Sequence, residues 1–172
     1  MGFAGVAVTG AGAQETIWPA VQREWTDDPQ GKAKTLAYKP ASKTWGALHY
    51  PLTSPAAGAW MGLSELTALG DDRFAVIERD NLFGAKAVKT LATFSVKGLT
   101  PAPLGAASIP TVEKKLLRDL TPSLLALNGY GLDKVEGMTV DRDGNLFVVT
   151  DNDGVDDSSG ETQFLALGKI AN

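Results

Sequence analysis

The sequence predicts an all-β protein, a partial β-propeller of about three four-stranded antiparallel blades of which the last is incomplete. Short apolar segments separated by turn residues recur along the chain, with no amphipathic helix between them, and this pattern disfavours a parallel α/β fold. The pattern restarts twice, which gives repeats of approximately 1–53, 60–120 and 133–170 within a single domain spanning 1–172. The second strand of each repeat is almost wholly apolar, as expected for strands buried between stacked blades.

The first repeat is expected to form one antiparallel sheet of four strands joined by turns. The strands are predicted over residues 3–9, 16–22, 34–38 and 45–52. Pro19 lies inside the second strand and predicts an edge or a bulge there, because proline cannot donate a ladder hydrogen bond.

The second repeat is expected to contain strands over 61–69, 73–78 and 88–96. The Pro- and Ala-rich segment 98–110 has no periodicity and is predicted to be an insertion loop. Residues 114–120 fit one face of a helix, but the four-strand rhythm favours an outer strand. A threonine followed by proline at 121–122, with a glycine closing the segment, predicts one short helix.

The third repeat is expected to contain strands over 135–141, 146–150 and 163–167. Gly5, Gly62 and Gly137 align the first strands of the three repeats. Closed propellers need about four to eight blades, so we expect the chain to be the C-terminal part of one. Unpaired blade edges would then favour self-association.

The composition excludes several classes of function. A formal net charge of −4 without a basic cluster argues against nucleic acid as a partner. The absence of cysteine excludes thiolate metal ligands and cysteine nucleophiles. No apolar run reaches the ~20 residues that span a bilayer, and the first residues do not look like a secretory signal. One histidine and no Gly-x-Ser-x-Gly turn make a Ser-His-Asp esterase a poor fit.

Acidic residues at a strand end are the best candidates for a site. Asp151, Asn152 and Asp153 follow the apolar strand 146–150, and Glu136 lies on the neighbouring inner strand. Oxygen ligands of this kind suit calcium. The alternative is turn chemistry, in which the same side chains cap backbone groups. The spacing does not fit an EF-hand, and 141–145 is assigned to a hairpin turn.

Carboxylates inside apolar strands need a partner, because an unpaired buried charge is costly. Glu65 and Glu136 are therefore expected to bind a metal or to be paired by Arg79 or by backbone amides. Glu78 and Arg79 are adjacent in the sequence. They either belong to the site or form an ion pair that supports the corner of a blade.

The segments GLSELTALGDDRFAVIERDN (62–81), KVEGMTVDRDGNLFVVTDND (134–153) and GETQFLALG (160–168) resemble the phytase-like family, described by the "esterase-like activity of phytase". The resemblance implies a β-propeller, a phosphoesterase-type activity and export of the bacterial parent protein to the periplasm or the outside of the cell. The polar positions that correspond are Glu65, Glu78, Arg79, Asp80, Glu136, Asp151, Asn152 and Asp153. The chain departs from the family at Ala4, where a first repeat often carries glutamate between phenylalanine and glycine.

The predicted function is metal-assisted hydrolysis of a phosphate ester at the central face of the propeller. Glu136 and Glu78 are the predicted catalytic residues, and Arg79 and Asp80 are expected to place a small anionic substrate. Calcium is expected on Asp151, Asn152, Asp153 and Glu65. The alternative is a non-catalytic propeller that binds a ligand or a protein partner, since this fold hosts many functions.

Overall fold

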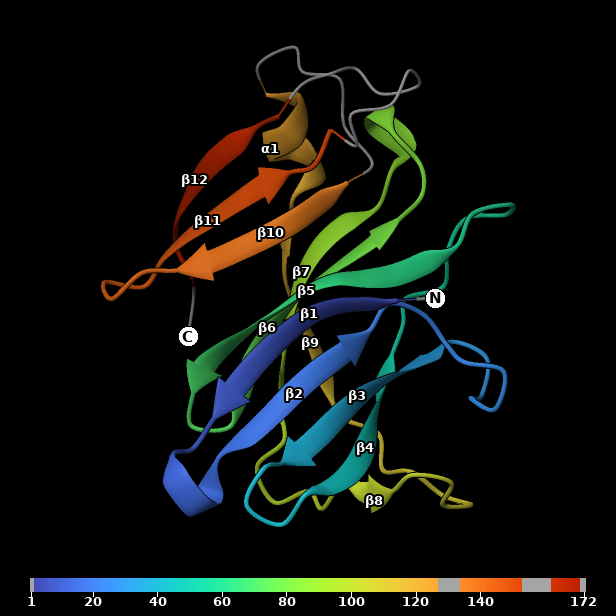
Figure 1. Ribbon diagram of the computed structural model, residues 1–172. Coiled ribbons are helices and arrows are strands. Elements are labelled where there is room, and N and C mark those ends of the chain that lie inside the picture. Colours follow the sequence, from blue (N-terminus) through green and yellow to red (C-terminus); the bar gives the residue numbers. More distant parts are fainter. Residues whose placement is uncertain (1, 127–133, 153–161, 171–172) are drawn as a thin grey trace.

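Three antiparallel sheets stack side by side in the computed structural model, which describes residues 2–126, 134–152 and 162–170 (Figure 1). The sheets have five, four and three strands and follow one another along the chain, apart from one short strand that returns to the first sheet. This arrangement confirms the all-β class and the partial propeller.

The first sheet has the strand order β1-β2-β3-β4-β8. Its strands are β1 (Phe3–Thr9), β2 (Thr16–Val21), β3 (Lys32–Lys39), β4 (Thr44–Pro51) and β8 (Ala102–Pro103). The predicted edge position of Pro19 is wrong, because β2 lies between β1 and β3. The β2–β3 ladder registers Ile17 with Tyr38 and Ala20 with Thr35, and Pro19, which has no N–H to donate, falls in the interval between them.

Strand β8 corrects the prediction of a simple loop over 98–110. Its two residues pair with Gly46 and Ala47 at the outer edge of β4. A Cβ added at Gly46 would lie 2.7 Å from the Cβ of Pro101. Because Gly46 has no side chain, the returning chain can approach the edge of β4 closely. It can therefore pair there without an apolar pattern of its own.

The second sheet has the order β5-β6-β7-β9 and the third the order β10-β11-β12. The strands are β5 (Met61–Gly70), β6 (Arg73–Asp80), β7 (Lys89–Ser95), β9 (Lys114–Asp119), β10 (Val135–Val140), β11 (Asn145–Thr150) and β12 (Phe164–Lys169). Of the two alternatives for 114–120, the strand is confirmed, and so is the short helix, α1 (Thr121–Leu125). Single 3-10 turns form η1 (Gly12–Gln14) and η2 (Gly84–Lys86). Among the described residues, no helix is long and apolar enough to cross a membrane.

The first strand of every sheet carries a bulge near its start. The register shifts between Phe3 and Gly5 in β1, between Leu63 and Glu65 in β5, and between Val135 and Gly137 in β10. Matching the repeats on these bulges superposes Ala4, Ser64 and Glu136. The alignment through Gly62 is therefore wrong by three residues, because Glu65 occupies the position that glycine has in the other two repeats.

Apolar layers between neighbouring sheets form the core. Between the first and second sheets, the ring of Trp18 meets Phe74 edge-on at 5.5 Å between centroids, and Phe74 stacks on Phe94 at 5.2 Å. A second layer, which includes Ile77 and Val148, joins the second and third sheets. Because aromatic rings and branched side chains bury large apolar areas, these layers hold the sheets together.

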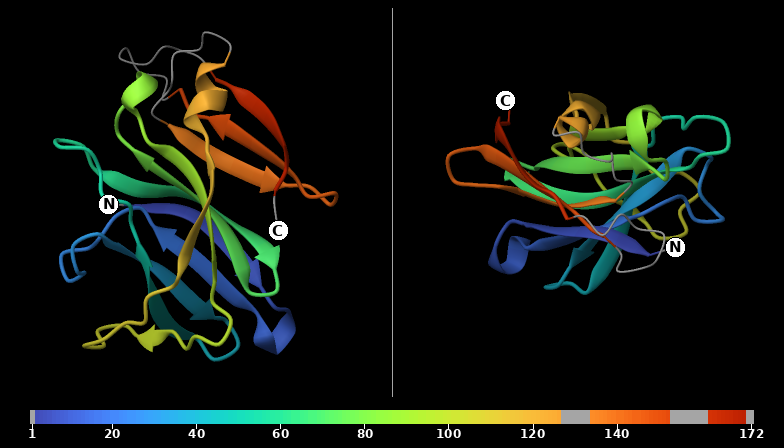
Figure 2. Two further views of the ribbon diagram at one scale, coloured as in Figure 1. Left: turned by 180° about the vertical axis from the view of Figure 1, so that it is seen from behind. Right: turned by 90° about the horizontal axis from the view of Figure 1, so that it is seen from above.

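Strands β1, β5 and β10 lie next to one another at the centre of the stack, with β5 in the middle (Figure 2). The approach is closest at Gly5, where an added Cβ would lie 2.8 Å from Glu65 Oε1 and would collide with the backbone nitrogen of Leu66. The starts of the three inner strands meet at one end of the stack, and the polar residues considered below gather there.

Candidate functional site

Arg79 and Glu136 form an ion pair between the second and third sheets. Arg79 Nη2 donates to Glu136 Oε1 over 2.6 Å. The side chain of Arg79 is 3% exposed, whereas that of Glu136 is 35% exposed. Close pairing offsets the cost of burying the guanidinium. The result is a buried cation beside a carboxylate that solvent and small molecules can reach.

Two arginines lie over the ring of Trp60, which extends the ion pair into a larger cluster. The Cζ atoms of Arg79 and Arg23 are 5.3 and 4.8 Å from the ring centroid, within range of cation–π attraction. In the described part of the chain, the Nε atoms of both arginines are buried without a hydrogen-bond partner. A buried donor without a partner costs free energy, so an oxygen ligand would satisfy these groups. We call Arg23, Trp60, Arg79 and Glu136 the arginine–tryptophan cluster.

A glycine makes room for this cluster. Gly62 on β5 pairs with Arg79 on β6. A Cβ added at Gly62 would lie 3.0 Å from Trp60 Cζ3, 3.2 Å from Arg23 Cγ and 2.9 Å from the backbone oxygen of Gln22. Any larger residue would push the ring and Arg23 away, so the small size of Gly62 is what brings Arg23 and Trp60 beside Arg79.

Glu78 faces away from the cluster, although it is the neighbour of Arg79. Successive side chains of a strand point to opposite faces of the sheet, and Glu78 faces the first sheet. Its fully buried carboxylate accepts hydrogen bonds from Tyr50 Oη (3.2 Å), from Lys114 Nζ (2.9 Å) and from the backbone nitrogen of Thr53. Burial and the nearby Glu78 carboxylate raise the pKa of Tyr50 well above its usual range. The predicted ion pair between Glu78 and Arg79 is therefore wrong.

Asp80 and Lys89 form a second, fully buried ion pair. Lys89 Nζ donates to Asp80 Oδ1 over 2.8 Å and to the backbone oxygens of Asp80 and Leu82 over 2.7 Å each. Asp80 Oδ2 accepts a hydrogen bond from the backbone nitrogen of Val88 over 2.9 Å. Both carboxylate oxygens of Asp80 are thus engaged inside the corner between β6 and β7.

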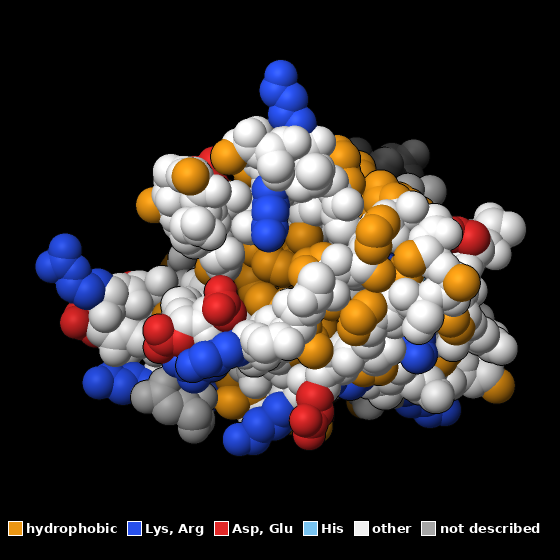
Figure 3. Space-filling view, turned by 90° about the horizontal axis from the view of Figure 1, so that it is seen from below, with side chains coloured by type: hydrophobic (Ala, Val, Ile, Leu, Met, Phe, Trp, Pro, Cys, Tyr) orange, Lys and Arg blue, Asp and Glu red, His pale blue; other side chains and the backbone are white. Residues whose placement is uncertain are grey.

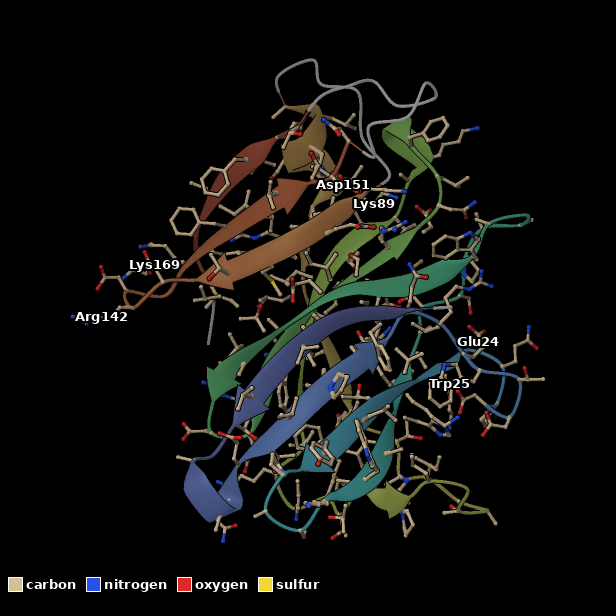
Figure 4. The ribbon with its side chains drawn as sticks, in the orientation of Figure 1. Glu24, Trp25, Lys89, Arg142, Asp151 and Lys169 are labelled. Atoms are coloured by element: carbon tan, nitrogen blue, oxygen red, sulfur yellow. The ribbon has the colours of Figure 1, made fainter. Side chains whose placement is uncertain are left out.

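The predicted calcium ligands are only partly within the described residues. Asp151 and Asn152 follow β11, with Asp151 labelled there in Figure 4. The backbone nitrogen of Asp151 donates to Lys134 over 2.8 Å, beside the start of β10. Asp153 lies outside the described residues. Within residues 2–126, 134–152 and 162–170, no group of three Asp, Glu or His side chains could hold a metal, and the full set of predicted calcium ligands is not within those residues.

The carboxylate of Glu65 is hydrogen-bonded by the backbone rather than by Arg79, which is one of the three alternatives predicted for it. Its Oε1 accepts a hydrogen bond from the amide of Leu66 over 2.7 Å. Burial disfavours the charged form and raises the pKa of Glu65, although the backbone amides of Leu66 and Met138 oppose that shift. Glu65 therefore lies between β1 and β10 in a position where its charged form is less favourable than in water.

Replacing Glu65 by glutamine is expected to stabilise the fold at neutral pH. A carboxyl whose pKa is raised on folding contributes stability that is present below its unfolded pKa and is lost as pH rises through its folded pKa. Glutamine has no charge to desolvate, so the gain should appear at pH 7 and vanish near pH 3.5. Thermal unfolding of both proteins at the two pH values measures it. An equal change in melting temperature at both pH values would contradict this explanation.

A second buried network holds the loop after β2 against the first sheet. Asp28 accepts hydrogen bonds from His49 Nε2 (3.0 Å), from the backbone nitrogen of Trp25 (2.9 Å) and from Lys34 Nζ. Burial favours the neutral acid, but the hydrogen bonds, led by that of Lys34, outweigh it and lower the pKa of Asp28. Figure 4 labels Trp25 in this loop. The single histidine, His49, thus has a structural role in this network.

A protein-family model named "Phytase-like" and described as "Esterase-like activity of phytase" matches residues 1–154. The matched region contains the whole arginine–tryptophan cluster and ends before β12. No curated protein and no solved structure gives a significant match to the chain.

Proposed function

Because the chain belongs to the phytase-like family, we propose that it is a phosphoesterase whose substrate binds at the arginine–tryptophan cluster. Membership supports a phosphatase- or esterase-like function at the level of the family. One observation carries the finer proposal: a buried arginine with an unsatisfied Nε lies 2.6 Å from an accessible carboxylate. Such a pair can bind an anionic group and move a proton next to it.

The guanidinium groups would hold the phosphate. Arginine presents its donors in a planar fork that matches phosphate oxygens. Arg79 and Arg23 both contact the ring of Trp60, so the same aromatic side chain holds two cations in place before a substrate arrives. This preorganisation favours the charge that builds up on the phosphate oxygens in the transition state.

Glu136 would act as the general base in this proposal. Its carboxylate takes a proton from a water molecule as that water attacks phosphorus. The P–O bond to the alcohol then breaks, inorganic phosphate forms, and the alcohol leaves with a proton from solvent. We give Glu78 and Asp80 supporting roles, because buried hydrogen bonds engage their oxygens.

Turnover of a panel of phosphomonoesters by the purified chain tests the proposal. Arg79→Lys keeps the positive charge but loses the fork, so we expect kcat/KM to fall by about 10- to 100-fold. Arg118→Lys is the matched control, because Arg118 lies on β9, at the edge of the second sheet, and donates to the backbone oxygen of Leu167 on β12. Equal activity of the two variants, with both folded, would overturn the assignment of the substrate site to Arg79.

Calcium on Asp151, Asn152, Asp153 and Glu65 stays a prediction. The described residues contain no group of three Asp, Glu or His side chains that could hold it, and no step of the proposed reaction passes through a metal. Calorimetric titration with calcium tests it, alongside thermal unfolding with and without chelator. Saturable binding that Asp151→Ala abolishes would support the prediction, and absence of binding would refute it.

Two further expectations remain proposals. Self-association is supported by exposed apolar side chains on β1 and β12, since Val6, Val8 and Phe164 are 56%, 50% and 69% exposed. Sedimentation over a range of concentrations tests it, and a constant monomer mass would refute it. Export of the parent protein rests on the family resemblance, and fractionation of cells that produce the native protein tests that.

A further inference from the structure

A groove of about 880 Å³ opens between the second and third sheets, at the end where β5 turns into β6. It is lined by Arg73 at the start of β6, whereas Arg79 is six residues farther along that strand. A strand rises about 3.3 Å per residue, which puts roughly 20 Å between the two positions. The groove is therefore separate from the arginine–tryptophan cluster.

The floor of the groove is apolar. Its larger side chains come from both sheets and include Leu69, Leu117, Val140 and Ile170. All four are only half-buried. Seen from below, hydrophobic side chains gather in a hollow with basic and acidic side chains at its border (Figure 3). A volume of this size lies within the usual range of small-molecule sites, about 300–1,000 Å³.

The rim of the groove carries an excess of positive charge. Its four exposed cations are Arg73, Lys97, Lys115 and Arg142, and Arg142 projects from the turn between β10 and β11 (Figure 4). None of the four takes part in an ion pair within the part of the chain that the structure describes.

The two acidic side chains of the rim do not balance these cations. Glu113 and Asp141 are the acids that line the groove. Asp141 is already engaged, because its carboxylate accepts hydrogen bonds from the backbone nitrogens of Asp143 and Asn145 and from the side chain of Asn145. These bonds, the side-chain one first, lower the pKa of Asp141. It therefore stays a charged part of the hairpin turn rather than a partner for the basic residues.

We infer that this groove binds a small anionic amphiphile, with an apolar tail on the floor and a phosphate, sulfate or carboxylate head group among the rim cations. The tail would cover aliphatic surface that the sheets leave exposed to water. The head group would lie beside rim cations that have no ion-pair partner among the described residues, which favours an anion over a neutral molecule of the same shape. The inference does not rest on the proposed phosphoesterase activity.

Calorimetric titration of the whole chain with octyl sulfate, well below its micellar concentration, tests the inference. A sulfate ester is not a substrate for phosphate hydrolysis, so the measurement reports binding alone. The variant R73A/K115A removes two rim cations from exposed positions. The matched control K39A/K86A removes the same charge from exposed lysines outside the groove. Octyl glucoside carries the same tail on a neutral head group, and inorganic sulfate carries the charge without the tail.

The expected result is that R73A/K115A weakens octyl sulfate at least about tenfold while the control changes it less than about twofold. Octyl glucoside and inorganic sulfate should each bind at least about tenfold more weakly than octyl sulfate. Undiminished binding by R73A/K115A, or equal binding of inorganic sulfate, would overturn the inference. Glu136→Gln should leave the affinity unchanged, so failure here and failure of the phosphoesterase proposal are distinguishable.

Discussion

Asp80→Ala is expected to lower the free energy of unfolding by about 3–5 kcal/mol, the usual cost of removing one partner of a buried ion pair. The side chains of Asp80 and Lys89 are 0% and 1% exposed, so water cannot replace the lost carboxylate, although Lys89 still donates to the backbone oxygens of Asp80 and Leu82. The variant also removes the acceptor for the backbone nitrogen of Val88. Urea unfolding followed by far-UV circular dichroism measures the change.

Asp27→Ala provides the matched control. Asp27 also pairs with a buried lysine, Lys34, at 3.1 Å, but its own side chain is 69% exposed. Lys34 keeps a second partner in Asp28. The loss should therefore stay within about 1 kcal/mol, as for exposed ion pairs. If the two variants lost the same stability, burial would not be what makes the Asp80–Lys89 pair costly to break.

Most of the fold follows from local patterns in the sequence. Alternating or continuous apolar runs mark strands β1 to β7 and β9 to β12, because burial against a neighbouring sheet needs apolar residues at set intervals. Strand β8 has two residues, too few for any period, and the room at Gly46 decides its place. The alignment of the repeats through Gly62 was wrong, because this glycine leaves room for Trp60 and for the backbone of Gln22. The bulges, and not this glycine, mark the equivalent positions of the three repeats.

The candidate site was predictable only in part. A charge in an apolar strand must find a partner, and that rule correctly offered Arg79 as the partner of Glu136. Strand alternation also implies that Glu78 and Arg79 point to opposite faces, which argues against their pairing. Arg23 was missed because it lies in the loop after β2, and only the folded chain brings it over Trp60. The sequence signal that could have indicated the room for Arg23 was Gly62, which pairs with the charged residue Arg79 of an otherwise apolar strand.

Glu136→Gln is expected to reduce kcat for a phosphomonoester by about 10²- to 10⁴-fold, the usual contribution of a general base. Glutamine has nearly the same shape and can still accept a hydrogen bond from Arg79, and the side chain is 35% exposed. Because Arg79 is 3% exposed and would lose its anionic partner, we expect the melting temperature to fall, so the activities are compared at a temperature where both proteins are folded. Steady-state kinetics over a range of pH, with thermal unfolding of each protein, makes the measurement.

The same experiment separates catalysis from binding. If Glu136 is the base, the variant should lose kcat and leave KM little changed. If Glu136 only orients Arg79, the variant should raise KM and leave kcat intact. Binding of a phosphate ester without turnover, by the unaltered chain as well as by the variant, would instead favour the non-catalytic propeller. In that outcome the Arg79–Glu136 pair binds a ligand without reacting with it. The accessible carboxylate of Glu136 then disfavours ligands with a large negative charge, because like charges repel.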